Sequence, residues 1–320
     1  MKSSKSKVAI VGSGLVGSST AFSLITQGVC DEVLMIDINE EKAAGEVRDL
    51  RNSIQYLDRN VHVKTATYAD CHDVDILVIT AGAPPKPGQS RLDTLDMTAN
   101  IAKSIVEPVM ASGFDGIFIV VSNPVDIMAY LVYKLSGLPK NQVIGSGSSV
   151  DTARLTNFIA DLVDVDPRSV YAYAMGEHGD SLMVPWSTVT ITGKKFLDVI
   201  HDNPEMVGDV DLAELVTKTT REGWEIYNRK GTTYYGIASA CVGIIKAILF
   251  DENKIIPVST LLEGEYGEQD MFAGVPVILN RQGASDILEI HMTEDEQTKW
   301  QASTDVIKEF TNKIRHYYQE

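Results

Sequence analysis

Cysteine and long apolar runs are both scarce in this sequence. Its 320 residues include three cysteines, Cys30, Cys71 and Cys241, which lie far apart and form no C-x-x-C pair. That spacing argues against a disulfide framework or a zinc site and favours a reducing compartment. No apolar stretch reaches the roughly 18 residues that a membrane span requires, and the N-terminal residues lack the apolar core of a signal peptide. We therefore expect a cytoplasmic protein with neither a metal site nor a membrane partner.

Positive charge is scarce as well. Lysine and arginine number 28 against 44 aspartates and glutamates, so the formal net charge is -16. Such a surplus of negative charge repels nucleic acid and anionic lipid surfaces, which argues against a nucleic-acid partner. An anionic substrate would have to be held by local cations that overcome this field.

Fixed-period repeats, low-complexity segments and Ser/Gly-rich linkers are absent, and the length is sufficient for two domains. In the first half, strand-like apolar runs alternate with helical patterns. The strand-like runs are residues 7–11, 32–37, 61–66, 75–80, 116–121 and 142–145. Their continuous valine and isoleucine content predicts strands buried on both faces, as in a parallel sheet with crossover helices. Ligands of such sheets bind at the carboxyl ends of the strands.

The second half has a different pattern. Its strand-like runs, residues 170–175, 187–192, 273–280 and 284–292, are interspersed with long helical patterns. A last helix is predicted from about Thr293, where "TEDE" resembles a capping box, and its apolar stripe fits the protein's own core better than a partner's groove. The sequence thus predicts an α/β protein. A Rossmann doubly wound parallel sheet (residues 1–147) precedes an α+β substrate domain (residues 148–320).

A glycine-rich turn follows the first predicted strand. Gly12, Gly14 and Gly17 form a G-x-G-x-x-G motif that opens a helix, and Asp37 ends the next strand, 20 residues (37 − 17) after Gly17. In this context the motif predicts a dinucleotide site, in which the pyrophosphate meets the helix N-terminus. The carboxylate of Asp37 accepts hydrogen bonds from ribose hydroxyls and repels a 2′-phosphate. We therefore predict NAD as the cofactor; a glycine-rich turn without a ligand is the alternative.

Histidine is also rare, with six residues, and one of them has a distinctive context. His178 lies in "GEHGDS", while "SSVDTARL" places Asp151 and Arg154 three residues apart, on one face if the segment is helical. An aspartate bonded to one imidazole nitrogen fixes the tautomer, so that the other nitrogen can exchange a proton with a substrate oxygen. The guanidinium of Arg154 can grip a carboxylate with two prongs. A surface or core histidine without a catalytic role is the alternative.

These motifs together resemble those of the L-lactate dehydrogenases of the lactate/malate dehydrogenase superfamily, in their bacterial form. The resemblance is carried by "GSGLVG", "IDIN", "TAGAPPKPGQSRLD", "SNPVDI", "VIGSGSSVDTAR", "GEHGDS" and "KGTTYYGIA", in this order between residues 12 and 238. It implies an NAD-dependent oxidoreductase that reversibly transfers hydride between NADH and a small 2-oxo acid, with pyruvate and L-lactate as the first expectation. It also implies a homotetramer.

The resemblance further implies roles for individual residues. His178 would donate and accept the proton, Asp151 would orient it, and Arg154 would hold the substrate carboxylate. Residues 81–93 would be the family's mobile loop, which closes over the substrate and brings Arg91 to the substrate carbonyl; an ordinary proline-rich connection is the alternative. Further substrate contacts would come from Asn123, Asp126, Thr233 and Pro85. The cofactor positions would be Gly12, Gly14, Val16, Gly17, Asp37, Lys42, Tyr68, Gly82, Ala83, Ser104, Asn123 and Ser146.

Two positions depart from the family's pattern. Pro85 falls where lactate-specific members typically have glutamine and malate-specific members arginine, which argues against malate and leaves a bulkier apolar 2-oxo acid open. Thr156 and Tyr171 fall where many bacterial members use an arginine and a histidine to bind fructose 1,6-bisphosphate. We therefore expect weak or absent activation by that sugar phosphate.

Other functions remain as alternatives at this point. Malate dehydrogenase is the runner-up within the same class. An NAD-dependent glycosidase shares this type of nucleotide domain but needs a Cys/His metal site, and none of the three cysteines lies in a catalytic motif. A non-catalytic binding protein would be expected to have lost His178, Asp151 or Arg91, and all three are present.

Overall fold

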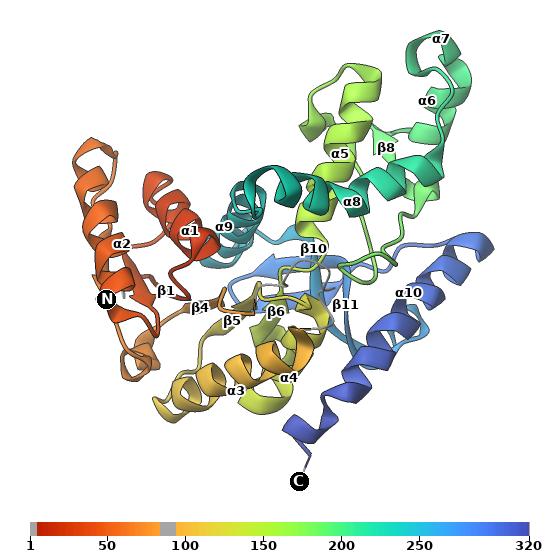
Figure 1. The fold of residues 1–320 in the computed structure, drawn as a ribbon. Coiled ribbons are helices and arrows are strands. Elements are labelled where there is room, and N and C mark those ends of the chain that lie inside the picture. The colour runs from red at the N-terminus through yellow and green to blue at the C-terminus, as the bar shows by residue number, and fades with distance from the viewer. Residues whose placement is uncertain (1–4, 84–93, 320) are drawn as a thin grey trace.

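A nine-stranded sheet runs through the part of the chain that the computed structural model describes, residues 5–83 and 94–319 (Figure 1). Six strands of this sheet are parallel. In spatial order they are β3 (His62–Thr65), β2 (Glu32–Ile36), β1 (Lys7–Val11), β4 (Ile76–Ile79), β5 (Ile117–Val120) and β6 (Val143–Gly145). The order 3-2-1-4-5-6 is that of a doubly wound Rossmann sheet. All six strands were predicted from their apolar runs, and the predicted α/β fold is confirmed.

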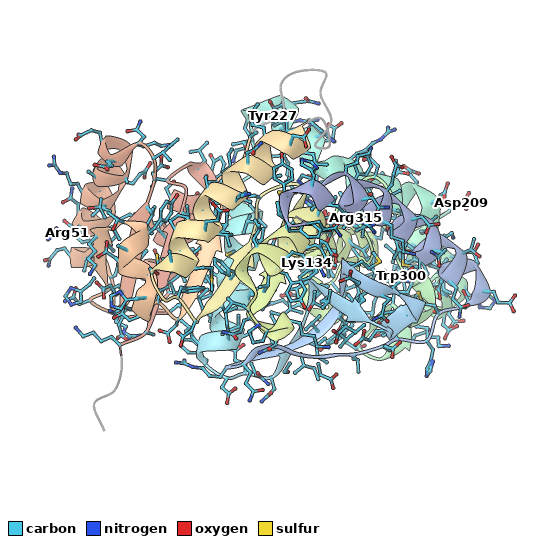
Figure 2. The ribbon with its side chains drawn as sticks, turned by 90° about the horizontal axis from the view of Figure 1, so that it is seen from below. Arg51, Lys134, Asp209, Tyr227, Trp300 and Arg315 are labelled. Atoms are coloured by element: carbon cyan, nitrogen blue, oxygen red, sulfur yellow. The ribbon has the colours of Figure 1, made fainter. Side chains whose placement is uncertain are left out.

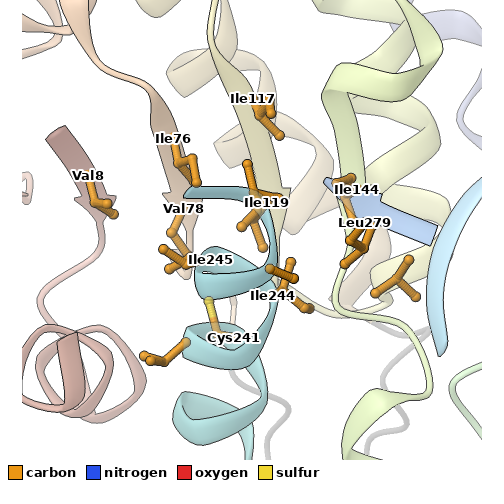
Figure 3. Close-up of a cluster of buried hydrophobic side chains, with 14 of the residues drawn as sticks. Val8, Ile76, Val78, Ile117, Ile119, Ile144, Cys241, Ile244, Ile245 and Leu279 are labelled. Carbon is orange, nitrogen blue, oxygen red and sulfur yellow. The ribbon is translucent and has the colours of Figure 1, made fainter. Parts of the chain in front are cut away.

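Helices cover both faces of the parallel strands, as the unbroken apolar runs predict. One face packs against α1 (Leu15–Thr26), α2 (Glu40–Ser53) and α9 (Tyr235–Leu249), and the other against α3 (Leu95–Ala111) and α4 (Val125–Ser136). Successive residues of a strand face opposite sides: Val8 and Ile10 belong to the first core, Ala9 and Val11 to the second. Figure 3 shows the first core, where Ile244 and Ile245 of α9 meet the strands. Each such buried side chain contributes roughly 1.5–3 kcal/mol.

Three antiparallel strands from the second half extend the same sheet. They are β10 (Lys254–Glu263), β11 (Gln269–Asn280) and β12 (Gly283–Ile287), and β10 joins β6 where Ser259 pairs with Gly145. The predicted strands at 273–280 and 284–292 overlap β11 and β12. Strand β10 was not predicted. Its run "KIIPVSTLLE" contains Pro257, which is typical of edge strands rather than of a strand with neighbours on both sides.

A separate lobe lies beside this sheet and has its own apolar core. It contains the helices α5 (Ser149–Val163), α6 (Phe196–Asp202), α7 (Pro204–Val207) and α8 (Leu212–Lys230), and the short strands β7 (Val170–Tyr171), β8 (Thr190–Ile191) and β9 (Lys194–Lys195). The strands predicted at 170–175 and 187–192 are therefore present but shorter. After Tyr171 the chain leaves the small sheet, and Gly176 instead forms a bridge with Gly274 of the large one.

The last helix begins and packs as predicted. In α10 (Glu294–Lys313), Thr293 and Glu296 form a reciprocal capping box. Trp300, Ile307 and Ile314 are buried against the two cores of the large sheet, and Figure 2 shows α10, which carries Trp300, beside α4, which carries Lys134. Short 3-10 helices lie at Ile54–Tyr56, Tyr68–Asp73, Lys140–Gln142, Pro167–Ser169, Trp186–Thr188, Glu265–Gly267 and Arg315–Tyr317. Within the described ranges, no helix is long and apolar enough to cross a membrane.

Candidate active site

The glycine-rich turn between β1 and α1 has the shape that a dinucleotide requires. Gly12 has a φ of 106°, which favours glycine, and a Cβ on Gly17 would lie 1.9 Å from the carbonyl oxygen of Gly12. A Cβ on Gly14 would meet nothing within 4 Å. No side chain among the described residues caps the N-terminus of α1, and its first turn has no acidic residue. The turn therefore offers uncapped amide groups and open space, which suit a phosphate.

Asp37 follows β2 and turns back to this glycine loop. Its Oδ2 accepts a hydrogen bond from the amide of Ser13 (2.6 Å), and its Oδ1 accepts one from the amide of Asn39 (2.9 Å). Asp37, Ile38 and Tyr68 line one hollow of about 530 Å³, and Ile38 is 98% exposed. Burial raises the pKa of the Tyr68 phenol. A fixed carboxylate beside the apolar side chains of Ile38 and Tyr68 matches the needs of a ribose and its base.

A second hollow, of about 300 Å³, lies at the carboxyl ends of the central strands. The predicted residues Val16, Gly82, Ala83, Asn123 and Thr233 all line it, although they come from four separate parts of the sequence. The Oδ1 atom of Asn123 is buried and has no hydrogen-bond partner among the described residues. A buried amide oxygen without a partner is costly and calls for a ligand donor. The residues present therefore fit the nicotinamide end of NAD.

His178, Asp151 and Arg154 form one connected chain of polar groups. The ring Nδ1 of His178 is hydrogen bonded to Oδ2 of Asp151, and Nη1 of Arg154 donates to Oδ1 of the same carboxylate at 2.8 Å. Asp151 and Arg154 share a face of α5, as their spacing predicted. The three side chains are only 4% to 11% exposed, so their charges interact with little screening by water. Asp151 thus holds both the imidazole and the guanidinium in place.

Asp126 holds the main chain of the same histidine. Its Oδ2 accepts a hydrogen bond from the amide of His178 at 2.9 Å. The residue is 2% exposed, and burial raises the pKa of its carboxyl to about 6, against the opposing effect of the Ser259 hydroxyl and the His178 amide. The resemblance implied a substrate contact for Asp126. In the structure its carboxylate holds the main chain of His178, and the substrate contact stays a prediction.

The remaining predicted positions differ in how they relate to these groups. Ser146 is buried after β6, and its amide donates to the carbonyl of Val120 at 2.8 Å. Lys42 and Ser104 are exposed on α2 and α3 and line neither hollow. Arg91 and Pro85 lie outside the described residues.

Three residues of α8 line the second hollow and were not predicted. Gly223, Trp224 and Tyr227 come from α8, and the rings of Trp224 and Tyr227 meet edge to face at 5.6 Å (Tyr227 is labelled in Figure 2). In the sequence they form part of an amphipathic helix. Only the folded structure relates them to the site, because there they line the same hollow as Asn123 and Thr233. Among the described residues, no group of three or more His, Cys, Asp or Glu side chains could hold a metal ion.

Comparisons with known proteins agree with this geometry. The family model for the lactate/malate dehydrogenase NAD-binding domain matches residues 6–145, and that for the lactate/malate dehydrogenase alpha/beta C-terminal domain matches residues 148–317. L-lactate dehydrogenase 3 of Bacillus cereus is 51% identical over 314 residues, which are 98% of this chain and 99% of that protein. L-lactate dehydrogenase 1 of Bifidobacterium longum is 46% identical over 305 residues, 95% of this chain and 96% of that protein.

A solved structure shows the same likeness in three dimensions. The minor L-lactate dehydrogenase of Enterococcus mundtii, in its ligands-bound form, superposes with a TM-score of 0.93 at 44% identity and covers 97% of this chain and 98% of that one. The two family models and these relatives therefore match nearly the whole chain to one family. The chain belongs to the lactate/malate dehydrogenase family, and its cofactor is NAD.

Proposed function

We propose that this NAD-dependent L-lactate dehydrogenase-type oxidoreductase interconverts pyruvate and L-lactate, with His178 as the proton donor and acceptor. The chain of hydrogen bonds from His178 through Asp151 to Arg154 carries the proposal. Because Nδ1 is bonded to Asp151, the proton is exchanged through Nε2, and the carboxylate stabilises the protonated imidazole. Arg154 binds the substrate carboxylate, and Asp151 fixes the orientation of the Arg154 guanidinium.

Bound NAD supplies or accepts the hydride at the substrate's second carbon. Gly12, Gly14 and Gly17 hold its pyrophosphate at the start of α1, and Asp37 holds a ribose. Asn123 fixes the nicotinamide end from the second hollow. The family model for the NAD-binding domain matches this part of the chain. We assign four more residues to the same cofactor because they line the two hollows: Tyr68 lines the first, and Val16, Gly82 and Ala83 line the second. Lys42, Ser104 and Ser146 are assigned to it from the family resemblance alone.

The walls of the second hollow favour a small substrate without a second charge. Its described lining residues carry no ionisable acid or base other than Tyr227. A second carboxylate that reached this hollow would meet no counter-charge among these residues, at a cost of several kcal/mol, since Arg154 and His178, proposed to hold the first carboxylate and the carbonyl, do not line it. Pro85, the family's discriminating position, also supplies none. Both relatives named above are L-lactate dehydrogenases, which favours pyruvate; a bulkier apolar 2-oxo acid remains the second candidate because Pro85 replaces the usual glutamine.

The setting of the enzyme is proposed on the same grounds. We assign residues 1–147 to the NAD-binding domain and 148–320 to the catalytic domain, which the two family models support by meeting between residues 145 and 148. We further propose a homotetramer, from the family resemblance. We propose a cytoplasmic location because the three cysteines are buried and form no disulfide. Arg91 is assigned the polarisation of the substrate carbonyl from the resemblance alone.

A panel of 2-oxo acids tests the function directly. Loss of NADH absorbance is followed with pyruvate, oxaloacetate, 2-oxoisocaproate and phenylpyruvate, and kcat/KM is compared among them. Pyruvate should give the largest value and oxaloacetate the smallest. Oxaloacetate as the best substrate would contradict the proposal, and a larger value for 2-oxoisocaproate than for pyruvate would favour the second candidate.

A further inference from the structure

The loop that carries His178 is attached to the C-terminal helix through one buried hydroxyl. The Oγ atom of Ser303, on α10, accepts a hydrogen bond from the amide of Glu177 at 2.8 Å. Ser303 is fully buried and is separated from Glu177 by 126 positions in the sequence. The contact is made one residue before the proposed proton donor.

The loop is shaped so that α10 can come this close. Gly176 has a φ of 86°, and a Cβ there would lie 2.2 Å from the Ser303 hydroxyl, so any other residue would push α10 away. The amides of Gly176 and Gly274 donate to each other's carbonyl groups at 2.9 Å, which ties the loop to β11. Helix and strand therefore fix the same end of the loop.

The hydroxyl of Ser303 has a donor role as well. It lies 3.3 Å from the hydroxyl of Ser181, which itself donates to the carboxylate of Glu177. Because the hydrogen of Ser181 is used for Glu177, the hydrogen between the two serines comes from Ser303. A Cβ on Gly179 would lie 2.3 Å from that carboxylate, so glycine allows Glu177 to fold back across the loop. Ser303 thus closes a network that spans residues 177–181.

Two consecutive amides at the histidine are therefore held by side chains of two different helices. Ser303 of α10 accepts from Glu177, and Asp126 of α4 accepts from His178. We propose that Ser303 is a positioning residue for the reaction: its hydroxyl sets the position of the His178 main chain and so the alignment of the imidazole with the substrate. This proposal rests on the proposed role of His178. Misplacement of a reacting group by a fraction of an ångström to 1 Å is sufficient to cost one to two orders of magnitude in rate.

The test compares Ser303→Ala with the parent enzyme. The substitution removes one oxygen atom and leaves the Glu177 amide without its acceptor. We expect kcat for pyruvate reduction to fall about 10-fold, from the loss of alignment, while the KM for pyruvate and the affinity for NADH change by less than about twofold. With NADH deuterated at the transferred position, the primary isotope effect on kcat should increase, because hydride and proton transfer become slower than product release.

Thr304→Val is the matched control, since Thr304 is the next residue of α10, is fully buried, and donates to Glu268 at 2.7 Å rather than to the loop. It should lower the unfolding midpoint but leave kcat and the isotope effect at the parent values. Equal kcat and isotope effects in Ser303→Ala and the parent, or the same changes in both variants, would overturn the proposal.

Two further variants keep the result interpretable. Ser303→Cys keeps the shape of the side chain with a somewhat larger atom that accepts a hydrogen bond poorly; if Ser303→Ala does not fold, a lowered kcat in Ser303→Cys supports the proposal and a parental kcat refutes it. His178→Ala separates the two hypotheses. Full turnover in His178→Ala would refute the proposed function, whereas an inactive His178→Ala beside a fully active Ser303→Ala would refute the positioning role alone.

Discussion

Replacing Asp126 by asparagine should stabilise the protein at neutral pH. Burial raises the pKa of this carboxyl from 3.8 to about 6, so the folded chain holds the ionised form at a cost. The difference corresponds to roughly 3 kcal/mol. An asparagine carries no charge, its carbonyl oxygen still accepts from the His178 amide, and its NH₂ group can donate to the nearby Ser259 hydroxyl.

The sign of the pH dependence follows from the raised pKa. Between about pH 4 and 6 the folded protein keeps a proton that the unfolded chain has released, so the Asp126 contribution to stability falls as the pH rises through this window. The asparagine variant lacks this dependence. The difference in unfolding free energy between variant and parent should therefore be near zero at pH 4 and should grow to at most about 3 kcal/mol above pH 7.

Urea unfolding followed by tryptophan fluorescence, at one protein concentration and at pH 4.5, 6 and 8, measures this difference. Other carboxylates titrate in both proteins and cancel. A difference that does not change with pH would refute the reasoning. Asp126→Ala is the control: it leaves the His178 amide without an acceptor and should be less stable than Asp126→Asn at every pH, by about 1–3 kcal/mol.

Four further outcomes are expected. His178→Ala should bind NADH normally by fluorescence titration yet lose turnover by about 10²–10⁴-fold; unchanged turnover would exclude it as the proton donor. Arg154→Lys should mainly raise the KM for pyruvate, because an ammonium cannot reproduce the two-pronged contact, and an unchanged KM would argue against that contact. Pro85→Arg should raise the oxaloacetate-to-pyruvate ratio of kcat/KM, and a constant ratio would show that position 85 does not face the substrate. Millimolar fructose 1,6-bisphosphate should not shift the pyruvate saturation curve, given Thr156 and Tyr171; a clear left shift would show that another cationic clamp exists.

The parallel half of the sheet was predictable because its signal is local. All of its strands except β3 are apolar runs, and many of the predicted cofactor positions follow the strand ends by one to three residues, as Asp37 follows β2 and Asn123 follows β5. The glycine motif and the Asp151–Arg154 spacing are equally local. A local pattern specifies local structure, and the order of a doubly wound sheet then brings the strand ends together.

The rest of the site depends on contacts between distant parts of the chain. Asp126 meets the His178 amide across 52 positions, and nothing in "SNPVDI" indicates which amide it will meet. Trp224 has the pattern of a helix residue in the sequence, and only the packing of α8 against α5 brings it to the second hollow, beside the residues that follow β5. Strand β10 was missed for a similar reason: it takes its place from its pairing with β11 and β6, which overrides the proline in its sequence.

The charges around His178 explain how an acidic protein can bind an anionic substrate. Asp151 and, above pH 6, Asp126 are negative, and Arg154 is the positive group that the described residues place against Asp151. Below about pH 6 the Asp126 carboxyl is largely protonated, which lowers the negative charge near His178 and weakens the repulsion of a substrate carboxylate. The largely buried guanidinium of Arg154, which water screens little, supplies the local attraction for a substrate carboxylate that the acidic surface of the protein lacks.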